Sequence, residues 1–109
     1  MPHLQMTRAL AHCGRIRELL LRHSGGWADI DALTGFRELT SAAAGAADDP
    51  ECAGMMRSAD RYALDLFSAS AHQNWATGEL SGTDFLRSQI LGLLEAFSDR
   101  LMYLDVVGQ

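Results

Sequence analysis

The segment DFLRSQILGLLEAFSDRLMYLDVV, residues 84–107, decides the expected fold. Apolar residues recur in it at intervals of three or four, which is the period of a helix with one buried stripe. The stripe consists of Leu86, Ile90, Leu93, Phe97, Leu101 and Leu104. A second apolar strip, made of Leu91, Leu94 and Met102, runs beside it. The segment is therefore predicted to be a helix that is nearly central in the fold or that lies at a contact between subunits.

The chain before this segment predicts three further helices. Their expected bounds are residues 4–23, 29–47 and 50–77. Asp29 is suited to cap the second helix, and Asp49 followed by Pro50 has the residues preferred at the start of a third. Glycines follow the first and third segments, where helices commonly end. Because the joints are short, the prediction is an all-α, antiparallel up-down-up-down four-helix bundle.

Length and composition agree with a single helical domain over residues 1–109. The chain has 48% hydrophobic residues and only two prolines, which is typical of a globular protein. It contains no run of eighteen uncharged apolar residues, so no membrane span is expected. The first ten residues lack the basic start and apolar middle of a signal peptide, which favours a cytoplasmic location.

The surplus of apolar residues on the last two predicted helices suggests an interface. On the helix predicted over residues 50–77, a separate strip lies about a third of the circumference away from the main apolar face. Combined with the second strip on residues 84–107, the candidate interface is Leu64, Phe67, Ala71, Trp75, Leu91, Leu94 and Met102. A monomer would leave part of this surface in contact with water.

Charge narrows the classes of function. The net charge of −5 disfavours nucleic acid and acidic membranes as partners. All nine basic residues are arginine, which excludes Schiff-base chemistry and a phosphate-loop lysine. Arg8, Arg15 and Arg22 are spaced by seven along the outer side of the first predicted helix. This row is either a solvated face or a docking strip for an acidic partner.

No pattern of residues predicts a catalytic site, a metal or a cofactor. Cys13 and Cys52 fall on apolar helical faces and are expected to be reduced thiols in the core. Asp65, Ser68 and His72 share a face of the helix predicted over residues 50–77. On a straight helix, however, the aspartate would lie two turns from the histidine and could not orient it as a catalytic triad requires.

Two hypotheses of function remain. The first is a non-enzymatic cytoplasmic protein-protein interaction module of the adaptor, chaperone or regulatory type. It would form a homodimer or dock a partner helix through the candidate interface, without nucleic acid or membrane. The alternative is a sensor domain that holds a small molecule in an apolar cavity between helices, and its candidate pocket is Cys52, Met55, Met56 and Tyr62.

Overall fold

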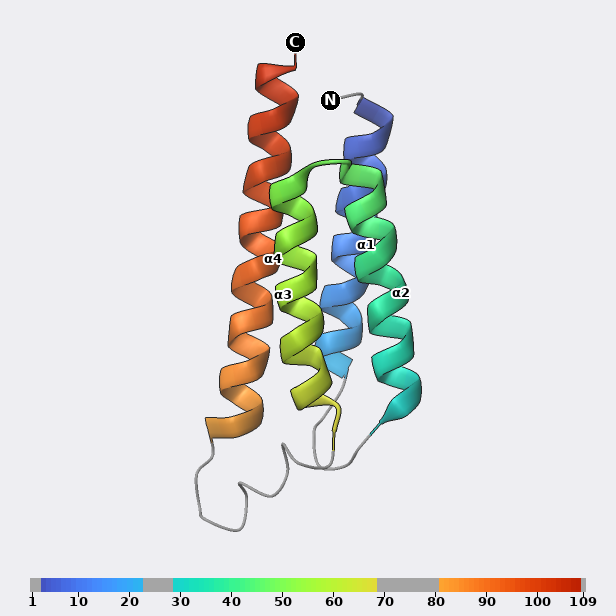
Figure 1. Cartoon of the computed structure of the whole chain (residues 1–109), viewed down its shortest axis with the longest axis vertical. Helices are drawn as coiled ribbons and strands as arrows, with labels where there is room; N and C mark the ends of the chain where they lie inside the picture. Colours follow the sequence, from blue (N-terminus) through green and yellow to red (C-terminus); the bar gives the residue numbers. More distant parts are fainter. Residues whose placement is uncertain (1–2, 23–28, 69–80, 109) are drawn as a thin grey trace.

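The described part of the chain forms four helices. The computed structural model describes residues 3–22, 29–68 and 81–108. The helices are α1 (His3–Arg22), α2 (Ile30–Ala47), α3 (Pro50–Leu66) and α4 (Ser81–Val107), and the described residues contain no strand. The predicted all-α four-helix bundle is therefore confirmed (Figure 1).

Successive helices run in opposite directions, as the ribbon in Figure 1 shows. Contacts between residues distant in sequence agree with this direction. The Asp29 amide at the start of α2 donates to the Phe67 carbonyl at the end of α3, at 3.0 Å. On α1 and α4, the Cys13 thiol contacts the Leu94 carbonyl at 3.7 Å and the Ser98 hydroxyl at 3.8 Å. Each helix thus packs against two neighbours around one core.

The starts of α2 and α3 follow the capping signals in the sequence. The Asp29 carboxylate accepts a hydrogen bond from the Ala32 amide at 2.9 Å, and the Asp49 carboxylate accepts one from the Cys52 amide at 3.1 Å. Pro50 occupies the first turn of α3, where its missing N–H costs no helical hydrogen bond. Both predicted N-caps are confirmed.

A two-residue turn joins α2 to α3, and Asp48 adopts a left-handed conformation in it, with φ of 48° and ψ of 50°. Its amide donates to the Ala44 carbonyl at 3.0 Å and so closes the end of α2. Glycine adopts this conformation at least cost, and a β-branched residue at the greatest. The turn is therefore held in a conformation that its own residue does not favour.

We expect Asp48→Gly to raise the free energy of unfolding by roughly 0.5 kcal/mol, because relief of left-handed strain exceeds the added entropy of the unfolded chain. Asp48→Val should lower it by about 1 kcal/mol or more. Urea denaturation of both variants checks this pair of opposite signs. Equal effects of glycine and valine would contradict the assigned backbone conformation.

The core is a continuous column of apolar side chains from all four helices. Its fully buried members are Ala9, Cys13, Ile16, Leu20, Phe36, Ala43, Ala47, Cys52, Met56, Ala59, Ala63, Leu66, Phe67, Ile90, Leu94, Phe97 and Leu101. Ile90, Phe97 and Leu101 belong to the stripe predicted on residues 84–107, and the rest of that stripe is partly buried. The prediction that α4 is a core helix is correct.

The third helix is shorter than predicted, because it ends at Leu66 and not near residue 77. Phe67 leaves the helical path, turns its ring into the core at 5.9 Å from the ring of Phe36, and accepts the Asp29 amide on its carbonyl. These contacts with α2 end the helix at a point that the apolar period does not mark. Residues 69–77 of the predicted helix lie outside the described residues.

Candidate functional site

At one end of the bundle, two of the described helices extend beyond the other two. Arg100 of α4 pairs with Asp49 in the α2–α3 turn, which fixes the level of that turn along α4. Residues 101–107 of α4 continue past it, and the start of α1 lies beside them (Figure 1). At 1.5 Å per residue this extension is roughly 10 Å long. We call these last turns of α4 and the first turn of α1 the projecting end.

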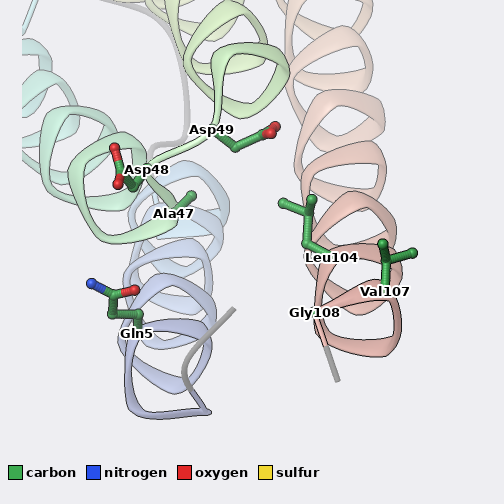
Figure 2. A pocket seen from close by; sticks show the side chains of 7 residues that line it. All are labelled: Gln5, Ala47, Asp48, Asp49, Leu104, Val107 and Gly108. Atoms are coloured by element: carbon green, nitrogen blue, oxygen red, sulfur yellow. The ribbon is translucent and has the colours of Figure 1, made fainter.

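A pocket of about 310 Å³ lies where the projecting end meets the α2–α3 turn. Its lining comes from α1, the turn and α4, namely Gln5, Ala47, Asp48, Asp49, Leu104, Val107 and Gly108. Figure 2 shows the Asp49 side chain directed toward α4, whereas the Asp48 carboxylate points away from it. The pocket, here called the end pocket, lies at the α2–α3 turn, where α1 and α4 begin to extend beyond α2 and α3.

An ion pair joins α4 to the α2–α3 turn beside the end pocket. The Arg100 Nε and Nη2 groups donate to the two Asp49 carboxylate oxygens, each at 3.1 Å. Arg100 also lies 3.5 Å from the Glu51 carboxylate, and its guanidinium carbon lies 5.3 Å from the centre of the Tyr103 ring. A two-pronged pair of this kind fixes orientation as well as distance. The pair thus fixes α4 relative to the α2–α3 turn at the base of the projecting end.

The pKa values of Asp49 and Cys52, both beside this ion pair, shift in opposite directions. The hydrogen bonds from Arg100 lower the pKa of Asp49 to about 2, and the Cys52 amide adds to this effect. Burial, and then the neighbouring Asp49 carboxylate, raise the pKa of the Cys52 thiol to about 12. Cys52 therefore stays protonated at neutral pH and is not an activated nucleophile.

Exposed apolar side chains gather on the projecting end. Nine large hydrophobic residues in the described part of the chain are exposed, and five of them are Leu4, Met102, Tyr103, Val106 and Val107. The other four, Leu21, Ile30, Leu64 and Phe85, belong to the opposite half of the bundle. Val106 is 72% exposed and Val107 62%. These five side chains make the projecting end a candidate contact surface.

The predicted interface is only partly available to a partner. Leu64 and Met102 are exposed and Leu91 is partly buried, but Phe67 and Leu94 are fully buried in the core. Assignment of these two to an outer strip is therefore wrong, because α1 and α2 already cover them. Ala71 and Trp75 lie outside the described residues.

The remaining members of that interface do not form one strip. Leu64 lines a pocket with Arg37 of α2, so it lies on the α2 side of α3. Leu91 and Met102 stand seven residues before and four after Ser98, which contacts α1. Helical spacing puts them on the α1 side of α4. The predicted strip is thus divided between opposite sides of the bundle, and only Met102 belongs to the projecting end.

The predicted ligand pocket is mostly core. Cys52 and Met56 are fully buried against neighbouring helices, while Met55 and Tyr62 are partly buried beside them. Neither the end pocket nor the pocket between α2 and α3 is lined by any of the four. Cys13 is also buried, and burial raises the pKa of its thiol. The prediction that both cysteines are buried is correct, and both are free thiols.

The row of Arg8, Arg15 and Arg22 is exposed along α1. The Arg22 Nε group donates to the Glu18 carbonyl at 3.4 Å, and none of the three forms a salt bridge with another described residue. A solvated face and a docking strip both fit this geometry, so the acidic partner stays a prediction.

The structure does not assemble the Asp65, Ser68 and His72 set on one helix. The helix has ended before Ser68, whose hydroxyl donates to the Asp65 backbone carbonyl at 3.0 Å, and His72 lies outside the described residues. In the described ranges, no three histidine, cysteine, aspartate or glutamate side chains are close enough to hold a metal ion. None of the described helices is both long and apolar enough to cross a membrane.

The importance of the projecting end was missed at the level of sequence. Its signal was Val106 and Val107, two apolar residues that follow the last member of the core stripe, Leu104. The pairing of Arg100 with Asp49 joins residues 51 positions apart and left no local signal. No protein-family model, curated protein or solved structure matches the chain.

Proposed function

We propose that this chain is a non-enzymatic interaction protein that pairs with a second copy of itself through the projecting end. The observation that carries the proposal is the extension of α1 and α4 past the α2–α3 turn, with five exposed apolar side chains on it. Beyond that turn, no other described helix packs against them. The exposed apolar side chains of α1 and α4 at this end could therefore pack against the same side chains of a second copy.

A second copy of the chain would cover the projecting end better than a single added helix would. Of the described helices, all four pass below the turn, whereas α1 and α4 alone continue beyond it. Two copies related by a twofold axis, end to end, would each bring two helices into the space above the other's turn. The overlap would then again contain four helices, which is a stable way to bury apolar helical faces.

The energetics favour a reversible dimer. Burying one large apolar side chain contributes roughly 1.5–3 kcal/mol, whereas association costs roughly 4–15 kcal/mol in lost freedom of motion. With five side chains per copy, some of them only partly covered, the contact is small, and we expect a dissociation constant in about the micromolar range. Such a contact would respond to protein concentration in the cell.

The cytoplasmic location remains part of the proposal. Two free, buried cysteines with no disulfide between them are consistent with a reducing compartment. The role as an adaptor, chaperone or regulator would follow from what the dimer binds.

We expect Val106→Gln combined with Val107→Gln to weaken self-association at least tenfold and to leave helicity unchanged. Glutamine is a good helix former and carries no charge, so the change removes apolar contact without disturbing the helix dipole. Sedimentation over a range of protein concentrations measures the effect.

The matched control is Leu21→Gln combined with Ile30→Gln. Leu21 is 63% exposed and Ile30 73%, so the control removes equally exposed apolar side chains from the opposite half of the bundle. It should leave the dissociation constant within about twofold of wild type. A wild-type chain that stays monomeric at millimolar concentration, or a control that dissociates as much as the test variant, would contradict the proposal.

A further inference from the structure

A second pocket, of about 330 Å³, lies between α2 and α3, away from the projecting end. Its lining is Arg37 of α2 together with Arg57, Asp60, Arg61 and Leu64 of α3. Arg57 and Arg61 are four residues apart and so share a helical face. Three of the nine arginines of an acidic chain thus meet at one hollow, which we call the arginine pocket.

The three guanidinium groups are not held in ion pairs by other described residues. None forms a salt bridge with another described residue, although Glu38 follows Arg37 and Asp65 lies four residues after Arg61. Arg61 and Asp65 have the spacing of an ion pair on a helix, but they do not form one. All three arginine residues are exposed, so their donors are available to a ligand.

Asp60, the acid that lines the arginine pocket, is hydrogen-bonded to Thr40. The hydroxyl of Thr40, itself fully buried, donates to the Asp60 carboxylate at 2.6 Å. Burial raises the pKa of Asp60, whereas the Thr40 hydrogen bond and the charge of Arg37 oppose that rise. Asp60 thus compensates one of the three positive charges, and the pocket retains a positive excess.

Leu64 adds an apolar contact to this charged site. Its side chain is 51% exposed at the pocket, next to the arginines. A carboxylate can accept two parallel hydrogen bonds from one guanidinium, and an apolar neighbour of that carboxylate can cover Leu64. A peptide with an acidic residue and a leucine-like residue one helical turn apart offers both groups. A nucleic acid offers no matching apolar group, and the net charge of −5 repels it.

We infer that the arginine pocket binds an acidic, leucine-containing segment of a partner protein through Arg37, Arg57 and Arg61. The chain would then have two contact surfaces, one for a second copy and one for this partner. The inference does not depend on dimer formation, because the two surfaces share no residue. A dimer would display two such pockets and would bind a divalent partner more tightly.

The test uses the full chain with labelled arginine side-chain nitrogens, titrated with a blocked helical peptide of Glu-Ala-Ala-Leu repeats. The side-chain resonances of Arg37, Arg57 and Arg61 should shift saturably with peptide concentration. Arg57→Gln combined with Arg61→Gln should weaken binding about tenfold. Arg8→Gln combined with Arg15→Gln, which changes the net charge equally on α1, should weaken it less than twofold. Arg61→Gln alone should give an intermediate loss.

Four results would overturn the inference. One is the absence of any shift at millimolar peptide. Another is a loss of binding in the α1 double variant that equals or exceeds the loss in the Arg57 and Arg61 double variant. An equal loss would mean unspecific attraction, and a greater loss would move the site to the row of Arg8, Arg15 and Arg22. A third is unchanged binding of a peptide with glutamine in place of glutamate. The fourth is equal binding of citrate, which would make a free anion the ligand. Sedimentation of the Arg57 and Arg61 variant reports separately on the dimer.

Discussion

Replacing Phe67 with alanine should lower the free energy of unfolding by about 3–5 kcal/mol, the usual cost of removing a fully buried aromatic ring. Phe67 is only 2% exposed, and its ring lies 5.9 Å from that of Phe36 at an interplanar angle of 59°. Alanine would leave a cavity between α2 and α3 and remove this ring contact. Guanidinium denaturation followed by circular dichroism measures the loss.

The control for this variant is Leu64→Ala, three residues earlier, in the last turn of α3. Leu64 is about half exposed, so its truncation should cost less than about 1 kcal/mol. The comparison decides between a core and an interface role for Phe67. A small change in stability together with a large loss of self-association would return Phe67 to the interface and contradict the fold around the end of α3.

The second large effect on stability is expected at Asp49, in the α2–α3 turn. Asp49→Ala should lower the free energy of unfolding by about 2–3 kcal/mol, because it removes the N-cap of α3 and the main partner of Arg100 together. Asp49→Asn should cost less, since asparagine still caps the helix but carries no charge. Urea denaturation of both variants separates the two contributions. Equal losses would mean that the cap adds nothing, and unchanged stability of Asp49→Asn would mean that the ion pair adds nothing.

The same residue predicts how stability depends on pH. The pKa of Asp49 falls from 3.8 to about 2 on folding, so the unfolded chain binds more protons between these values. Its contribution is therefore fully present above about pH 4 and is lost as the pH falls toward 2. The difference between wild type and Asp49→Asn should shrink by roughly 1–2 kcal/mol over that window. A difference that stays constant with pH would contradict the pairing with Arg100.

The sequence predicted those parts of the fold that depend on local rules. Asp29 and Asp49 cap helices because their side chains reach amides three residues ahead, and this needs no knowledge of the rest of the chain. The stripe on α4 was equally clear, because a buried face repeats with the helical period. The four helices and their order follow from these signals.

The end of α3 and the second apolar strip could not be interpreted correctly in this way. Phe67 ends the helix because it packs on α2 and accepts the amide of Asp29, which is a contact between distant residues. Leu94 looked like surplus apolar surface beside the main stripe. In a bundle, α4 packs against both α1 and α3, so its buried face is wider than a single stripe.

The candidate sites depend on the relative placement of whole helices. The arginine pocket joins Arg37 to Arg57 and Arg61 across two helices, and only the register between α2 and α3 brings them together. The projecting end exists because Asp49 lies level with Arg100 and not with the last turn of α4. Neither register is encoded in any short stretch of sequence.

The most direct test of the proposed pairing is an isotope-filtered NOE measurement on an equal mixture of carbon-13-labelled and unlabelled chains. At concentrations where sedimentation gives a dimer, we expect intermolecular cross-peaks between the methyl groups of Val106 or Val107 and the side chains of Leu4, Met102 or Tyr103. Cross-peaks confined to Leu21, Ile30 and Leu64, at the opposite half of the bundle, would contradict the account. So would the absence of any intermolecular cross-peak from the projecting end.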